Sequence, residues 1–174
     1  MPADGSETHN VASLPPVKYH VPMATGEIHY KRSRFSTRLT GDRLYTAGHA
    51  WLRREEDDLW RVGFTKFAIR MLGEAVEAGF EVEPGAPVGT GQLVGWIEGF
   101  KAITDLYAPL SGRFEGGNPE LAREIKLVQT DPYGRGWLYA VRGTPGADGL
   151  DAQGYVAVLD ATIDKMVGKR HDAE

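Results

Sequence analysis

Short apolar segments separated by turn residues dominate the middle of the chain. Aromatic and β-branched residues fill positions 44–53 and 59–64 on either side of an acidic turn at 55–58, and this pattern predicts a β-hairpin. Spacing of this kind is typical of a small sandwich or barrel of short strands. Further apolar segments, broken by glycine and proline and expected to be strands, lie at 76–82, 87–90, 92–97, 127–128 and 137–141.

Other segments carry signals for helices. Thr65 offers an N-cap hydroxyl to a segment with one apolar helical face, and Gly73 follows that segment as a left-handed C-cap. Asn118 with Pro119 forms a second helix start, because proline suits the first helical position. Apolar residues recur at helical spacing near the C-terminus. The sequence therefore predicts short helices near 66–72 and 119–124 and a C-terminal helix near 154–167.

The two ends of the chain differ from this middle part. Residues 1–22 are rich in Pro, Ser, Thr and Asn, which is typical of a flexible arm. Residues 30–38 carry many basic side chains, and a solvated edge segment is favoured there over a phosphate-binding patch. We therefore expect a partly flexible N-terminal extension at 1–42, a β domain at 43–142, and a linker with the C-terminal helix at 143–174.

Composition and charge narrow the class of protein. Of the 174 residues, 41% are hydrophobic and 25% are charged, as in ordinary globular proteins. The net charge of -4 argues against a general nucleic-acid binder. No apolar run approaches the ~18–20 residues that a membrane helix needs. The lack of cysteine excludes disulfides and thiolate chemistry and fits a reducing compartment, so we expect a cytoplasmic protein.

The usual catalytic patterns are missing from the sequence. No Gly-x-Ser-x-Gly elbow and no Gly-rich phosphate loop ending in Gly-Lys-Ser/Thr is present. A serine hydrolase and a nucleotide loop therefore have no support in the sequence, and we expect no metal site. None of the histidines has a partner at the i,i+4 spacing of a helical zinc site; they are His9, His20, His29, His49 and His171.

One lysine stands at the tip of a predicted hairpin. Apolar segments at 93–97 and 103–107 flank a tight turn whose only cation is Lys101. Hairpin tips face water, so this amine is accessible to another protein. Exposed lysines are charged at neutral pH and are poor nucleophiles, but a second enzyme can grip such a turn and acylate the amine. From composition alone, a solvated surface lysine is the simpler interpretation.

The residues around Lys101 belong to a series of sequence blocks that match a known family in the same order. The blocks are Leu44-Tyr45-Thr46 with His49 and Trp51; Val62-Gly63-Phe64-Thr65 with Ala68 and Leu72-Gly73; Glu98-Gly99-Phe100-Lys101-Ala102 with Thr104-Asp105-Leu106-Tyr107-Ala108-Pro109 and Ser111-Gly112; and Asp131-Pro132-Tyr133-Gly134-Arg135-Gly136-Trp137-Leu138. They resemble the H protein family of the glycine cleavage system, whose usual run at the lysine is Glu-Ser-Val-Lys-Ala. The likeness covers roughly residues 43–142, and collinear blocks make chance agreement remote.

The resemblance implies a fold and a function. The expected fold is mainly β, a lipoyl/biotinyl-type sandwich (barrel-sandwich hybrid) of two small antiparallel sheets with short flanking helices and a C-terminal helix. The expected cofactor is lipoate, joined covalently to Lys101. The expected role is a carrier, not an enzyme, that shuttles the aminomethyl group of glycine. The partners so implied are a pyridoxal-phosphate glycine decarboxylase, a tetrahydrofolate-dependent aminomethyltransferase, a dihydrolipoyl dehydrogenase and a lipoylating enzyme.

Glu98 and Asp105 lie close to the expected tip. They are either recognition groups for the lipoylating enzyme or solvated turn acids. Two other functions stay open: a lipoyl carrier for another multienzyme system, such as sulfur metabolism or lipoate relay, and an unmodified binding module.

The sequence also departs from the family pattern. Ala50 stands where the family often has Glu, and the segment 74–79 is shorter than its counterpart. We expect these changes to leave an amine-bearing arm less tethered to the protein, because a sheltered amine needs acceptors to replace its lost hydration.

Overall fold

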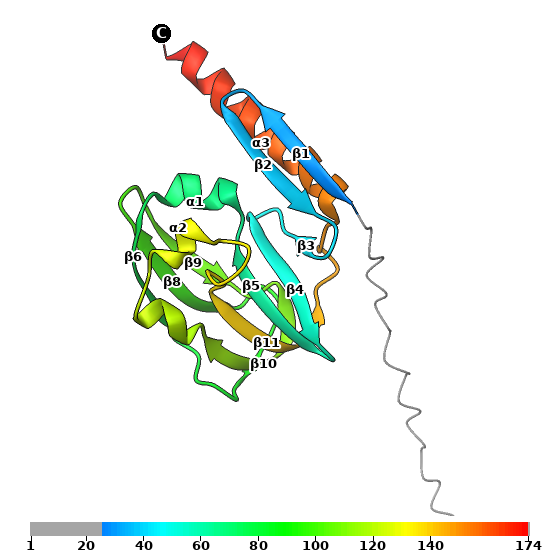
Figure 1. Ribbon diagram of the computed structural model, residues 1–174, viewed down its shortest axis with the longest axis vertical. Coiled ribbons are helices and arrows are strands. Elements are labelled where there is room, and N and C mark those ends of the chain that lie inside the picture. Colours follow the sequence, from blue (N-terminus) through cyan, green and yellow to red (C-terminus); the bar gives the residue numbers. More distant parts are fainter. Residues whose placement is uncertain (1–25, 174) are drawn as a thin grey trace, which may run out of the picture.

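The computed structural model describes residues 26–173, which fold into a mainly β body with one long helix (Figure 1). The first large sheet contains, in hydrogen-bonded order, β3 (Leu44–Tyr45), β4 (Ala50–Glu56), β5 (Leu59–Phe64), β11 (Tyr139–Pro145), β10 (Leu110–Gly117) and β7 (Pro87–Val88). The second contains β6 (Ala75–Phe80), β8 (Leu93–Gly99) and β9 (Ile103–Tyr107). Every strand pair in both sheets is antiparallel.

The two sheets enclose one apolar core. Leu52 and Val62 of the six-stranded sheet belong to the same buried cluster as Ile97 and Leu106 of the three-stranded sheet. In β10, Leu110 and Phe114 are buried, whereas Ser111, Arg113 and Glu115 are exposed, as expected for a strand with one face against the core. The expected antiparallel sandwich is therefore confirmed.

Two short helices lie where the sequence predicted them. In α1 (Lys66–Leu72) the Thr65 hydroxyl accepts a hydrogen bond from Ala68 N at 3.4 Å, and Gly73 follows with φ of 78°. The 3₁₀ helix η1 (Pro119–Ala122) begins after Asn118, whose Oδ1 accepts from Glu120 N at 3.0 Å. Both N-caps satisfy backbone donors that a helix leaves free in its first turn.

The structure differs from the predicted elements in three places. Residues 127–128 form the start of a helix, α2 (Leu127–Thr130), because a two-residue apolar pair carries no periodicity that separates helix from strand. The expected strand at 44–53 is interrupted by a turn at 46–49 that separates β3 from β4. Strand β11 continues to Pro145, so residues 143–145, at the start of the expected linker, are strand.

The C-terminal helix α3 (Ala152–Asp172) is confirmed and is longer than predicted. Asp151 caps it, since its Oδ1 accepts from Gly154 N at 2.7 Å. Tyr155, Leu159 and Ile163 are spaced four residues apart and form its buried face. This spacing places them on one side of the helix.

A strand pair, β1 (Glu27–Arg32) and β2 (Phe35–Thr40), packs along α3 at one end of the molecule (Figure 1). Tyr30, Phe35 and Leu39 are buried in a second apolar cluster with Leu159 and Ile163. The prediction of a solvated segment at 30–38 is therefore wrong for this face, although the basic side chains of the segment are exposed. The predicted flexible arm at 1–22 lies outside the described residues. No helix in the described part of the chain is long and apolar enough to cross a membrane.

Candidate functional site around Lys101

Lys101 lies at the exposed tip of the β8–β9 hairpin, as the sequence predicts. The turn is closed by a hydrogen bond from Gly99 N to Ala102 O at 2.8 Å. The neighbouring Phe100 side chain is 75% exposed, and Ile103 is 70% exposed. An apolar surface thus surrounds the lysine, and such patches mark contacts with other molecules.

The end of α1 fixes the backbone of this turn. Lys101 N donates to Leu72 O at 3.0 Å, and Phe100 N donates to Glu74 O at 3.0 Å. Glycine is required on both sides of this contact: a Cβ at residue 99 would lie 2.4 Å from Leu72 O, and Gly73 has a positive φ. The turn therefore presents a free side chain on a backbone held by hydrogen bonds.

The lysine side chain extends over α1 toward the C-terminal helix. Its Nζ donates to Arg70 O at 3.2 Å. There it lines a cavity of about 210 Å³, which we call the arginine groove. The groove lies between the β1–β2 turn, α1 and α3, and its lining comprises Arg32, Ser33, Arg34, Phe35, Phe67, Arg70, Met71, Lys101, Ile163, Met166, Val167 and Arg170.

A second cavity lies on the other side of α1. This cavity, the His49 cleft, has a volume of about 200 Å³. Its lining combines apolar side chains with the polar groups of His49, Thr104 and Asp105, and comprises Gly48, His49, Phe64, Ala68, Met71, Leu72, Ala102, Thr104 and Asp105. Met71 is thus shared between the arginine groove and the His49 cleft.

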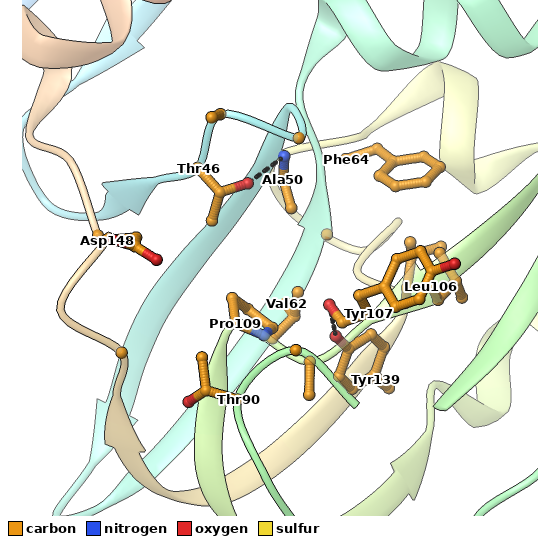
Figure 2. A pocket seen from close by; sticks show the side chains of 18 of the residues that line it. Thr46, Ala50, Val62, Phe64, Thr90, Leu106, Tyr107, Pro109, Tyr139 and Asp148 are labelled. Atoms are coloured by element: carbon orange, nitrogen blue, oxygen red, sulfur yellow. Dashed lines mark hydrogen bonds between the residues drawn. The ribbon is translucent and has the colours of Figure 1, made fainter. Parts of the chain in front are cut away.

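A third cavity, which we call the Tyr107 cavity, has a volume of about 310 Å³. It adjoins the His49 cleft and shares Gly48, Phe64 and Asp105 with it. Figure 2 shows Thr46, Ala50 and Asp148 on one side of this Tyr107 cavity, and Tyr107 and Tyr139 on the other. Tyr139 OH donates to Tyr107 O at 3.4 Å. The carboxylates of Asp105 and Asp148 make this side of the turn acidic.

His49 anchors the His49 cleft to the C-terminal helix. It has a positive φ of 66°, which lets the chain turn between β3 and β4. Its Nδ1 lies 2.9 Å from Tyr155 OH, which lies 2.8 Å from Thr65 Oγ1. Burial lowers the pKa of His49 and raises the pKa of the Tyr155 phenol, so both groups are neutral near pH 7.

The structure separates the two acids that the sequence singled out. Asp105 lines both the His49 cleft and the Tyr107 cavity, and its Oδ2 accepts from Tyr107 OH at 3.3 Å. Glu98 is half-buried and lines none of the three cavities. Sequence reasoning missed the contribution of Tyr155 and of the arginines of the groove. Their only sequence signals are the helical spacing of Tyr155 and the basic run in residues 30–38.

The described residues contain no group of three or more His, Asp or Glu side chains arranged to hold a metal ion. The turn itself offers an accessible amine with a cavity on either side of α1.

The chain is similar in sequence and in structure to proteins of one known family. The family model described as glycine cleavage H-protein matches residues 43–153. The glycine cleavage system H protein of Mycobacterium avium is 42% identical over 120 residues, which cover 69% of this chain and 89% of that protein. That of Mycolicibacterium smegmatis is 39% identical over 127 residues, covering 70% and 96%. The crystal structure of the Mycobacterium marinum H protein matches with a TM-score of 0.61 and 35% identity, covering 68% of this chain and 97% of that one.

Proposed function

This chain belongs to the glycine cleavage H-protein family, a family of lipoyl carriers, and we propose that Lys101 is its single lipoylated residue. The observation that carries the proposal is the exposed Lys101 side chain on a turn whose backbone is fixed against α1. A modifying enzyme needs an accessible amine in a defined position, and this turn supplies both.

The residues around Lys101 fit a lipoyl group. Acylation removes the charge of the amine but leaves an amide N–H, which can still donate to Arg70 O. Apolar side chains line the cavities on both sides of the turn and offer cover for an acyl chain. When bound, lipoate would supply a redox-active dithiolane, one sulfur of which can carry the aminomethyl group of glycine. The protein contributes position and shelter, and no residue of the chain is assigned a catalytic step.

The exposed side chains beside Lys101 support contact with several enzymes. Phe100 and Ile103 project next to the lysine and would be covered when a partner encloses the turn. The partners so proposed are the glycine decarboxylase, the aminomethyltransferase, the dihydrolipoyl dehydrogenase and the lipoylating enzyme. We propose Asp105, which lines two cavities, as a recognition group for the lipoylating enzyme. Glu98 lines none of the three cavities and is the weaker candidate.

Intact mass spectrometry tests the assignment. The wild-type protein, incubated with a lipoate ligase, lipoate and ATP, is expected to gain one lipoyl mass, and Lys101→Arg none. Lys126→Arg is the matched control: Lys126 pairs at 3.9 Å with Glu74, whose carbonyl accepts from the turn, so it is a nearby lysine outside the tip. It should be modified as wild type is.

The outcomes separate the remaining functions. A lipoyl mass that persists in Lys101→Arg contradicts the assignment. Absence of any modification in protein from its native host favours an unmodified binding module. A lipoylated protein that glycine decarboxylase cannot load points to another multienzyme system.

A further inference from the structure

The arginine groove differs from the other two cavities in the segments of the chain that form its walls. One wall is the turn between β1 and β2, which precedes residue 43, where the family match begins. Another wall is the part of α3 from Ile163 to Arg170, which follows residue 153, where the match ends. Two walls of the groove therefore lie outside the residues that the family model matches, and the groove opens beside Lys101.

The interior of the groove suits a short apolar chain. Phe35, Phe67 and Ile163 are buried along it, and the thioethers of Met71 and Met166 face the same space. Methionine side chains adapt to irregular ligands and contact sulfur and aromatic groups well. The volume of about 210 Å³ is below the roughly 300–1,000 Å³ of sites for drug-sized ligands. An acyl chain ending in a five-membered ring is a better match for this space.

The rim of the groove carries uncompensated positive charge. Arg32 is neutralised, because its guanidinium lies 2.7 Å from Asp164 Oδ1 and 3.2 Å from Asp160 Oδ1. Among the described residues, no ion pair involves the other rim arginines: Arg34, Arg70 and Arg170. An ammonium group entering the groove would meet like charges, whereas a neutral or anionic group would not.

The opposite side of α1 has the opposite charge. Asp105 and Asp148 line the Tyr107 cavity, and Asp105 also lines the His49 cleft. Lys101 lines the arginine groove, and the next residue, Ala102, lines the His49 cleft. A group attached to Lys101 Nζ can therefore swing to either side according to its charge.

We propose that the arginine groove is a second resting site for the acyl-dithiolane arm on Lys101, selective for arms without an amine. This inference rests on the proposed lipoylation of Lys101. Lys101 itself lines the groove, and its Nζ already lies against Arg70 O, so an arm extended from that atom begins inside it. The neutral arm lies in the groove, and an arm that carries an amine leaves it for the acidic side.

Methionine methyl groups report which side the arm occupies. The chain has four methionines, of which Met166 lines only the groove, Met71 lines both the groove and the His49 cleft, and Met1 and Met23 precede the described residues. In protein labelled with ¹³C-methyl methionine and shown by intact mass to be lipoylated, we expect the Met166 and Met71 signals to shift relative to unmodified protein. A shift of Met71 without Met166 would place the arm in the His49 cleft and overturn the proposal.

Charge selectivity is tested by capping the reduced arm. After reduction, alkylation of both thiols with iodoacetamide, iodoacetate or 2-bromoethylamine gives neutral, anionic and cationic arms. The Met166 shift is expected to persist with the first two caps and to vanish with the third. In the Arg34→Glu/Arg170→Glu variant the cationic arm should shift Met166 and the anionic arm should not. Lys169→Glu reverses one charge next to Arg170 but outside the groove and should behave as wild type.

The possible failures are distinct. Lack of lipoyl mass refutes the proposed function before any spectrum is recorded. A lipoylated protein whose Met166 signal is the same in all forms refutes the groove alone. An equal Met166 shift with all three caps refutes the charge selectivity.

Discussion

The sandwich that carries Lys101 and the region formed by β1, β2 and α3, here called the added region, are built from different kinds of contact. The sandwich of β3 to β11 encloses mostly aliphatic side chains, whereas β1, β2 and α3 pack through aromatic rings and polar pairs. Tyr45 stacks on Tyr155 with ring centroids 5.0 Å apart, and Phe35 meets Phe67 edge-on at 5.4 Å. Tyr30 OH donates to Asp160 at 2.8 Å. The added region is thus attached by directional contacts, which fix its orientation beside the turn.

The two regions contribute differently to the site: the sandwich positions the lysine that carries the arm, and the added region supplies the surface on which the arm rests. The backbone contacts that hold the Lys101 turn come from Leu72 and Glu74, both within the matched residues 43–153. The charged rim of the arginine groove comes largely from β1–β2 and α3. Damage to the added region should therefore change where the arm lies more than whether Lys101 is acylated.

The largest expected effect comes from deleting a buried leucine in each region. Leu110 in the sandwich and Leu159 in α3 both have no exposed surface. Each Leu→Ala change is expected to lower the free energy of unfolding by about 2–5 kcal/mol, because it leaves a cavity. With Leu159→Ala, hydrogen exchange should accelerate first in β1, β2 and α3, and the yield of lipoylation should hold.

Leu110→Ala is the matched comparison for that experiment. It should accelerate exchange in β8 and β10 and lower the yield of lipoylation, since the sandwich supports the turn. Equal acceleration over the whole described chain in both variants would show one cooperative unit and remove the distinction between the two regions.

The next largest effect concerns the Tyr155 hydroxyl of α3, which forms hydrogen bonds to His49 and Thr65 of the matched domain. Tyr155→Phe leaves His49 Nδ1 and Thr65 Oγ1 without their shared partner. The expected loss in the free energy of unfolding is about 1–3 kcal/mol, because both groups are largely buried. Tyr139→Phe is the control: its hydroxyl makes one long bond of 3.4 Å, so about 1 kcal/mol or less is expected. Denaturant midpoints measure both, and equal losses would contradict a special role for the Tyr155 hydroxyl.

The sequence predicted the two regions unequally for physical reasons. Alternation and turn residues identified the strands around Lys101, because those signals are local, and the motif blocks identified the lysine itself. The burial of Tyr30, Phe35 and Leu39 depends on α3, more than 100 residues away in the chain (the Tyr30–Asp160 pair spans 130 residues), so no local pattern could reveal it. The exposed basic residues of the same segment favoured the interpretation as a solvated edge. The arginine groove is assembled from four segments that are distant in the chain, so local patterns could not reveal it either.

A smaller effect should appear as a pH dependence of stability. Burial lowers the pKa of His49 from its ordinary value of 6.5, and the phenol of Tyr155 and the carboxylate of Asp105 are the polar groups described near it. Below about pH 6.5 the unfolded chain therefore binds a proton that the folded chain does not. Stability should fall as the pH falls from there through the folded pKa, with a slope of at most about 1.4 kcal/mol per pH unit for this proton.

His49→Asn removes that titration while keeping a residue that accepts a positive φ. Unfolding free energies measured between pH 7.5 and pH 5 should decline less steeply in this variant than in wild type. His171→Asn, at the exposed end of α3, is the control and should leave the slope unchanged. Parallel curves for wild type and His49→Asn would mean that other groups carry the acid dependence.

The smallest expected effect concerns Ala50, on the acidic side of the turn. Ala50 is half-buried and faces the Tyr107 cavity, where Asp105 and Asp148 already supply carboxylates (Figure 2). Ala50→Glu adds a charged acceptor for an amine-bearing arm on Lys101, so the loaded arm should lose its aminomethyl group more slowly. Because the position is partly solvated, the gain should stay below about 1 kcal/mol, less than a tenfold change in rate. Ala50→Gln matches the side-chain volume without the charge and should slow the loss less. The measurement is the rate of spontaneous loss from protein loaded by glycine decarboxylase. If Glu and Gln variants match wild type, the existing carboxylates suffice, and the departure at residue 50 is neutral for the amine-bearing arm.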